Sequence, residues 1–181
     1  MHAQRLLAFL LPISISGAAF SQDYTGSLSG TAEAPPNASP GIGTTTVTLD
    51  LTLKTLSIDV TFSGLVTGNT AAHIHCCIAP NGTVGVATQT PTFTGFPSGV
   101  TSGTYTHSFD MNLAASYNAA FLTANGGSTA TAFTALSNGI AAGQAYLNIH
   151  TVSFPGGEIR SFLRETSIFV NGFEATPVLR R

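Results

Sequence analysis

The stretch that decides the fold is AYLNIHTVSFPGGEIRSFL, residues 145–163. In its first half apolar and polar residues alternate, which is the period of a strand with one buried face. The sequence FPGG at 154–157 favours a turn, and a second short strand is expected over 158–163. The stretch therefore predicts a β-hairpin that closes the fold, with Ile149 and Ile159 pointing into the core.

A second stretch of the same character is AAHIH, residues 71–75. Side chains two positions apart on a strand point to the same face, so His73 and His75 should lie side by side. We expect the strand to run over residues 71–78.

Together, AHIH at 72–75 and the closing stretch resemble the two marks of the CHRD domain, the repeat named after chordin and also found singly in exported bacterial proteins. The similarity covers roughly residues 24–163. The chain departs from the family pattern at Cys76 and Cys77, where Gly is usual, and at Ser161-Phe162, which replaces a common Gly-Gln. The resemblance implies an architecture more than an activity.

Residues 1–21 have the pattern of a secretory signal peptide, with Arg5 ahead of an apolar run and small residues before Gln22. Polar residues and glycine interrupt the run, so it is too short for a permanent anchor. We therefore expect a secreted or periplasmic protein without a transmembrane anchor after cleavage. The CHRD domain should occupy residues 22–166, followed by a C-terminal tail at 167–181.

Charged residues make up only 8% of the chain, with six basic against eight acidic residues. No cluster of basic residues is available to bind phosphate backbones, which excludes nucleic acid as a partner. Any partner is expected to be a protein or a cell-surface ligand whose identity the sequence does not give.

The clearest structural signal is strict alternation over residues 47–53 and again over 56–62. It predicts two antiparallel strands joined by a two-residue connection, with eight apolar side chains facing the core. A further strand is expected over 101–111, where Tyr105 and His107 share a face.

Two segments do not fit a strand. Residues 84–102 are rich in Thr, Gly and Pro, which favours a long surface loop or a short edge strand. Residues 112–140 are rich in Ala and Leu and contain Asn-Gly-Gly, which predicts one or two short helices. The fold class is therefore all-β: an antiparallel Greek-key-like sandwich or flattened barrel with a short helical insertion.

The candidate metal ligands are His73, His75 and His150, with His107 as a fourth possibility. Imidazole suits copper and zinc, and copper–zinc superoxide dismutase also places a His-x-His pair on a strand of a Greek-key sandwich. The alternative is that these histidines only hold the closing hairpin through hydrogen bonds. Both interpretations remain open. Asn148 and Glu158 are natural neighbours in either case.

Arg160 shares a strand face with Glu158, which favours a local ion pair between them over a catalytic couple. Cys76 and Cys77 are the only cysteines, and three interpretations compete. They form a vicinal disulfide, which we rank first; one thiolate joins a copper site; or both are small buried apolar groups.

Motifs for nucleophilic or acid–base catalysis are missing from the sequence: it has no Gly-x-Ser-x-Gly, no phosphate-binding glycine loop and no close pair of carboxylates. The leading hypothesis is therefore an exported, non-catalytic binding or structural module. The alternative is a copper-binding or copper-dependent redox protein that uses His73, His75 and His150. An enzyme of this sequence would have to be metal-based.

Overall fold

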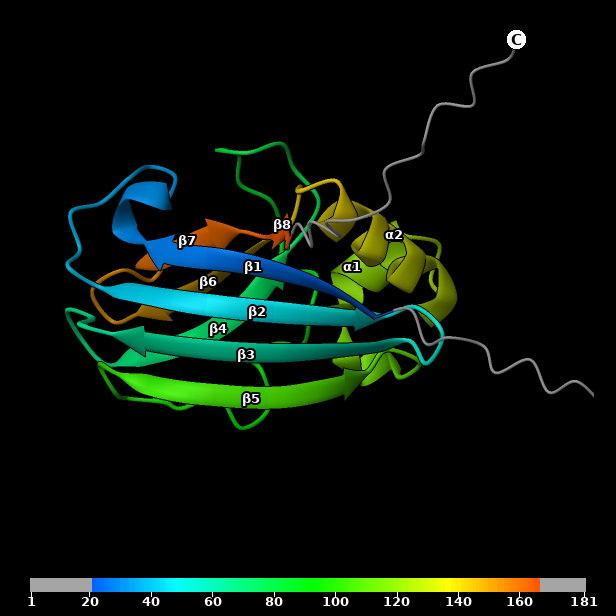
Figure 1. Cartoon of the computed structure of the whole chain (residues 1–181), viewed down its shortest axis with the longest axis horizontal. Helices are drawn as coiled ribbons and strands as arrows, with labels where there is room; N and C mark the ends of the chain where they lie inside the picture. Colours follow the sequence, from blue (N-terminus) through cyan, green and yellow to red (C-terminus); the bar gives the residue numbers. More distant parts are fainter. Residues whose placement is uncertain (1–20, 167–181) are drawn as a thin grey trace, which may run out of the picture.

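The computed structural model describes residues 21–166. The predicted tail (167–181) and all of the predicted signal peptide (1–21) except Ser21 lie outside the described residues. Eight antiparallel strands form one continuous sheet in the order β4-β6-β7-β1-β2-β3-β5, with β8 paired to β1. The sheet curls into a half-barrel (Figure 1). Its strands are β1 Ser21–Ser29, β2 Ile42–Asp50, β3 Thr55–Ser63, β4 Asn69–His75, β5 Gly103–Asp110, β6 Tyr146–Thr151, β7 Ile159–Phe162 and β8 Arg164–Glu165. The predicted all-β antiparallel class is confirmed, as one curled sheet.

The helical insertion is also confirmed. It consists of two short α-helices, α1 (Ala119–Ala124) and α2 (Thr129–Ala141), which lie together at one end of the half-barrel (Figure 1). Asn118 and Ser128 cap their N-termini by accepting hydrogen bonds from backbone N–H groups. Two further single turns of 3-10 helix, η1 (Gly30–Ala32) and η2 (Ala114–Ser116), occur in the connections. Among the described residues, no helix is long and apolar enough to cross a membrane.

The β2–β3 hairpin forms as predicted, but its connection is longer than expected. Asp50 accepts hydrogen bonds from the N–H groups of Thr52 and Leu53 and so closes a four-residue turn. Leu51 and Leu53 are therefore exposed, at 44% and 65%, instead of facing the core. The remaining six of the eight alternating side chains are buried.

The segment between β4 and β5 is irregular and most of it lies at the surface, as predicted, but its two aromatic residues point inward. Phe93 is fully buried and Phe96 nearly so. The Phe93 ring packs on Tyr105 and Phe109 of β5, while its backbone N–H donates to Ala72 of β4. The segment thus fills the gap between the two edge strands of the half-barrel, which explains why its aromatic residues are inside.

The closing hairpin is formed by β6 and β7 and places Ile149 opposite Ile159. Both side chains are fully buried, so the predicted inward face is confirmed. Because neighbouring residues on a strand point to opposite faces, Asn148 and His150 lie on the other, outer face of the sheet. The candidate site is built on that outer face.

Candidate metal centre

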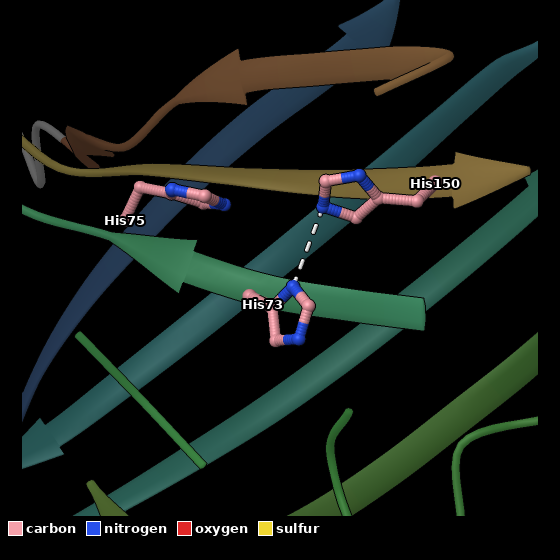
Figure 2. Close-up of side chains that lie close together, drawn as sticks. All are labelled: His73, His75 and His150. Atoms are coloured by element: carbon pink, nitrogen blue, oxygen red, sulfur yellow. Dashed lines mark hydrogen bonds between the residues drawn. The ribbon is translucent and has the colours of Figure 1, made fainter. Parts of the chain in front are cut away.

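The three histidines of the two sequence motifs come together on neighbouring strands. His73 and His75 project from β4 and His150 from β6, and β4 pairs with β6 so that Ala71 lies opposite His150. Figure 2 shows the three imidazoles on one side of the two strands. One ring nitrogen from each histidine lies within 4.8 Å of the others. The alternation read from the sequence therefore gives a three-histidine cluster.

The outward nitrogen of each ring meets a backbone carbonyl. His73 Nε2 lies 2.6 Å from the carbonyl oxygen of Pro91, and His75 Nδ1 lies 2.7 Å from that of Val84. His150 Nδ1 lies 3.0 Å from the carbonyl oxygen of Pro155. A carbonyl can only accept, so each of these nitrogens carries a hydrogen and donates it. The other nitrogen of each neutral ring then presents a lone pair.

These lone pairs converge. His73 Nδ1 and His150 Nε2 are 3.3 Å apart, and both are acceptors in the tautomers that the carbonyls select (Figure 2). His75 Nε2 is buried and has no hydrogen-bond partner among the described residues. Two nitrogens held about 2.05 Å from a tetrahedral ion are about 3.3 Å apart, which matches the observed spacing. This one pair therefore has the spacing of two ligands on a common ion, and the third histidine offers a nitrogen within 4.8 Å of both.

The surroundings keep the imidazoles uncharged. Burial lowers the pKa of His73 to about 4, against a smaller opposing effect of its hydrogen bond to Pro91, and the neighbouring imidazoles lower it further. Burial likewise lowers the pKa of His75 and of His150. Neutral imidazole is the form that binds a metal, so near neutral pH these rings need lose no proton before doing so.

His107, the fourth candidate, is not brought to this cluster. It lies on β5 opposite Ile58, and its ring packs edge-on against Phe109 at 4.5 Å between centroids. β5 is the far edge of the sheet from β4. His107 therefore does not belong to the cluster of three histidines.

Cys76 and Cys77 directly follow β4, and their sulfurs are joined in a disulfide. The Cys76 side chain is part of the core, on the opposite side of the chain from the imidazole of His75. Both sulfurs rest against Gly139 of α2, where a Cβ would come closer than real Cβ contacts allow. The histidine cluster includes neither cysteine.

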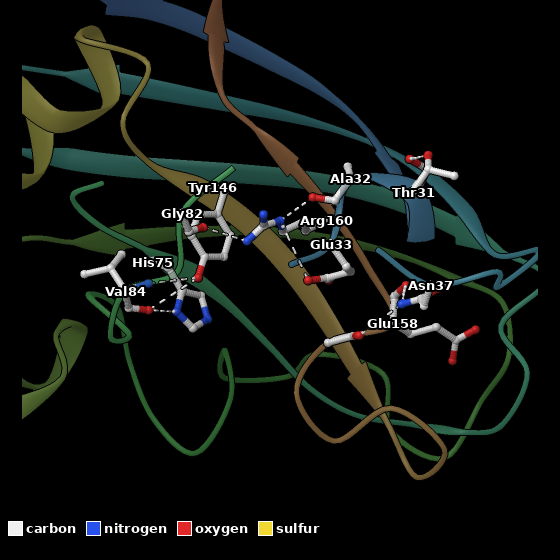
Figure 3. Close-up of polar contacts among 12 residues, drawn as sticks. Thr31, Ala32, Glu33, Asn37, His75, Gly82, Val84, Tyr146, Glu158 and Arg160 are labelled. Atoms are coloured by element: carbon white, nitrogen blue, oxygen red, sulfur yellow. Dashed lines mark hydrogen bonds and ion pairs between the residues drawn. The ribbon is translucent and has the colours of Figure 1, made fainter. Parts of the chain in front are cut away.

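A stack of side chains continues from the cluster across the outer face of the sheet (Figure 3). The ring of Tyr146 lies parallel to that of His75 at 4.7 Å, and the guanidinium of Arg160 lies 4.7 Å from the centre of the Tyr146 ring. Arg160 is 1% exposed and donates to the carbonyls of Ala32 and Gly82. Tyr146 thus covers one face of the His75 ring, and its hydroxyl donates to the same Val84 carbonyl oxygen, 3.3 Å away, that His75 Nδ1 contacts.

The predicted ion pair between Arg160 and Glu158 is wrong. Arg160 faces Glu33, with Nε and Oε2 3.7 Å apart. Glu158 is fully buried, and its carboxylate accepts hydrogen bonds from Ser39, Thr151 and the N–H of Val66. Sequence proximity suggested the pairing, but Glu158 precedes β7 and turns toward a different set of loops.

Sequence reasoning missed Tyr146, Arg160, Glu33 and the three backbone carbonyls, of Val84, Pro91 and Pro155, as parts of the site. Tyr146 and Arg160 could have been found from their alternation with core residues in the closing stretch, since both fall on the same face as His150. Val84, Pro91 and Glu33 lie in irregular segments that carry no periodic signal.

Comparison with known proteins agrees with the motifs. The model of the CHRD domain matches residues 24–163, which is most of the chain. No curated protein and no solved structure gives a significant match. The matched region spans β4, the irregular segment that holds the histidine rings, and the closing hairpin. The chain therefore belongs to the CHRD domain family, as a binding or structural module.

Proposed function

We propose that this protein is an exported, non-catalytic CHRD module that binds one divalent transition-metal ion, copper(II) or zinc(II), through His73, His75 and His150. The observation that carries the proposal is the 3.3 Å approach of His73 Nδ1 and His150 Nε2. Both atoms are lone-pair acceptors because the opposite nitrogen of each ring donates to a carbonyl. Two facing acceptors repel, and a cation between them turns that repulsion into two bonds.

The types of ligand atom, and the access of solvent to them, also support the binding of a metal ion. Three imidazoles suit copper and zinc, and each ring is fixed by a hydrogen bond from its other nitrogen, as metal-bound histidines usually are. His73 and His75 are buried, whereas His150 is partly exposed. An ion can therefore reach the site past His150 without opening the core.

The export part of the proposal rests on the pattern of residues 1–21, in which Arg5 precedes an apolar run that ends in small residues. N-terminal sequencing of the protein recovered outside the cytoplasm should begin near Gln22. Recovery of the chain with Met1 intact in the soluble cytoplasmic fraction would contradict export while leaving metal binding untouched.

The metal part is tested by thermal unfolding of the metal-free protein. A ligand that binds only the folded state stabilises it by about 2.7 kcal/mol at a hundred times its dissociation constant. For a domain of this size that corresponds to a rise of roughly 5–10 °C in the melting temperature. Copper(II) or zinc(II) should produce this rise with a stoichiometry of one ion per chain.

His75→Ala should abolish the rise, and His107→Ala is the matched control because that histidine lies outside the cluster. If neither metal moves the melting curve of the unsubstituted protein, the three histidines only form a hydrogen-bond network in the closing hairpin. The protein is then a module without a metal.

A further inference from the structure

Buried polar atoms without partners gather beside the histidine cluster. Among the described residues, five buried side-chain oxygen or nitrogen atoms lack a hydrogen-bond partner, and four of them belong to one outer-face group: Glu33 Oε1, His75 Nε2, Asn148 Oδ1 and Arg160 Nη2. Leaving such an atom unpaired is unfavourable. Four such atoms in one group call for a physical explanation.

Asn148 occupies the centre of this group. On the outer face of β6 it lies between Tyr146 and His150, and the pairing of strands places it opposite His73 on one side and Arg160 on the other. It is 2% exposed. Its carboxamide also reaches His75 closely enough to act on the pKa of that imidazole. All three clustered histidines are thus its neighbours.

The orientation of the carboxamide follows from its surroundings. Asn148 Nδ2 and Glu33 Oε1 lie 2.8 Å and 2.6 Å from the position that a Cβ on Gly157 would take, so the nitrogen end of the amide lies against this glycine. Gly157 has φ +130° and leaves this space free. Because Nδ2 is the end of the amide that lies at Gly157, the oxygen is the end directed away from this glycine. That oxygen is the unpartnered one.

We propose that Asn148 Oδ1 is the fourth donor of the metal centre, completing a site of three imidazole nitrogens and one amide oxygen. The proposal rests on the proposed function above and deepens it, because it makes the site closed. A site with three protein ligands keeps a position for water or substrate, whereas a four-ligand site holds its ion without offering such a position.

The test uses the copper(II)-loaded full chain and azide as a probe of an open coordination position. Azide should leave the visible and electron paramagnetic resonance spectra of the unsubstituted protein unchanged. Asn148→Ala should weaken copper(II) binding by at least about tenfold, the lower end of what loss of a supporting ligand costs. It should also allow azide to bind, which appears as a new azide-to-copper absorption band.

Asn138→Ala, an exposed asparagine on α2, is the matched control and should behave as the unsubstituted protein. Should Asn148→Ala fail to fold, Asn148→Asp keeps the side-chain volume and replaces the amide oxygen with a charged one. It should bind copper(II) more tightly and still exclude azide.

The outcomes separate the two proposals. If the unsubstituted protein binds neither copper(II) nor zinc(II), the proposed function fails and the question of a fourth ligand does not arise. If it binds copper(II) and azide adds to the metal without any substitution, the site is open and Asn148 is not a ligand. Equal copper(II) affinity and equal azide exclusion in Asn148→Ala overturn the inference in the same way.

Discussion

Glu33 should make the stability of this protein fall as the pH rises. Burial raises the pKa of its carboxyl from an ordinary 4.5 to about 7, against the opposing effect of Arg160 and of the N–H of Ala34. The folded chain therefore binds the proton more tightly than the unfolded chain. The resulting stabilisation is fully present below about pH 4.5 and is lost as the pH rises through about 7.

The size of the effect follows from the same values. A rise from 4.5 to about 7, at 1.36 kcal/mol per pH unit, corresponds to roughly 3 kcal/mol, an upper figure since solvent screening reduces it. The lowered pKa values of the three clustered histidines act in the opposite direction over an overlapping range, because they cost stability as the pH falls below 6.5. The profile of the unsubstituted protein alone is therefore ambiguous.

The comparison with Glu33→Gln resolves this. Urea unfolding of metal-free protein should be measured between pH 4.5 and pH 7.5 for both chains. The free energy of unfolding of the unsubstituted protein, relative to the variant, should fall by about 1–3 kcal/mol across this range. The charged and titratable groups that face Glu33 are Arg160 and Tyr146, and burial raises the pKa of Tyr146 further above this window. A difference that stays constant, or that grows with pH, would refute the raised pKa.

Two further predictions concern packing. Leu56→Ala should lower the free energy of unfolding in urea by about 2–5 kcal/mol, because Leu56 is fully buried. Leu53→Ala should change it by no more than about 0.5 kcal/mol, because Leu53 lies exposed in the turn. Equal losses of stability would mean that the turn is misplaced. Gly139→Ala should lower the free energy of unfolding by about 1–3 kcal/mol despite the better helix propensity of Ala, since its Cβ would collide with both sulfurs of the Cys76–Cys77 disulfide. Reduction of the disulfide should relieve this loss of stability. A variant as stable as the unsubstituted protein would contradict the close packing.

The alternation of apolar and polar residues was the sequence feature that predicted the structure best. It placed the strands of the β2–β3 and closing hairpins, and it brought His73, His75 and His150 to one face because the period of a strand is two residues. It failed at Leu51 and Leu53, where the pattern continues by chance into a turn that Asp50 closes through its own side chain. The local periodicity of apolar residues carries no information about such a competing side-chain hydrogen bond.

The rest of the site depended on contacts between segments far apart in the chain. The carbonyls of Val84 and Pro91, which contact the histidines, lie on the irregular segment that Phe93 anchors in the core. The partner of Arg160 is 127 positions away, at Glu33. In a single sequence, side-chain type and spacing give no information about such distant pairs.

The segment between β4 and β5 has an evolutionary consequence. Connections of this length usually accept insertions and deletions with little penalty. Here one stretch is buried through Phe93, seals the edge of β4 through backbone hydrogen bonds, and supplies the carbonyls that fix the rings of His73 and His75. A change of even one residue in its length between Val84 and Phe93 would rotate those carbonyls away from the imidazoles. In this domain, variation in length should therefore be confined to other connections, and the loop should evolve as slowly as a strand.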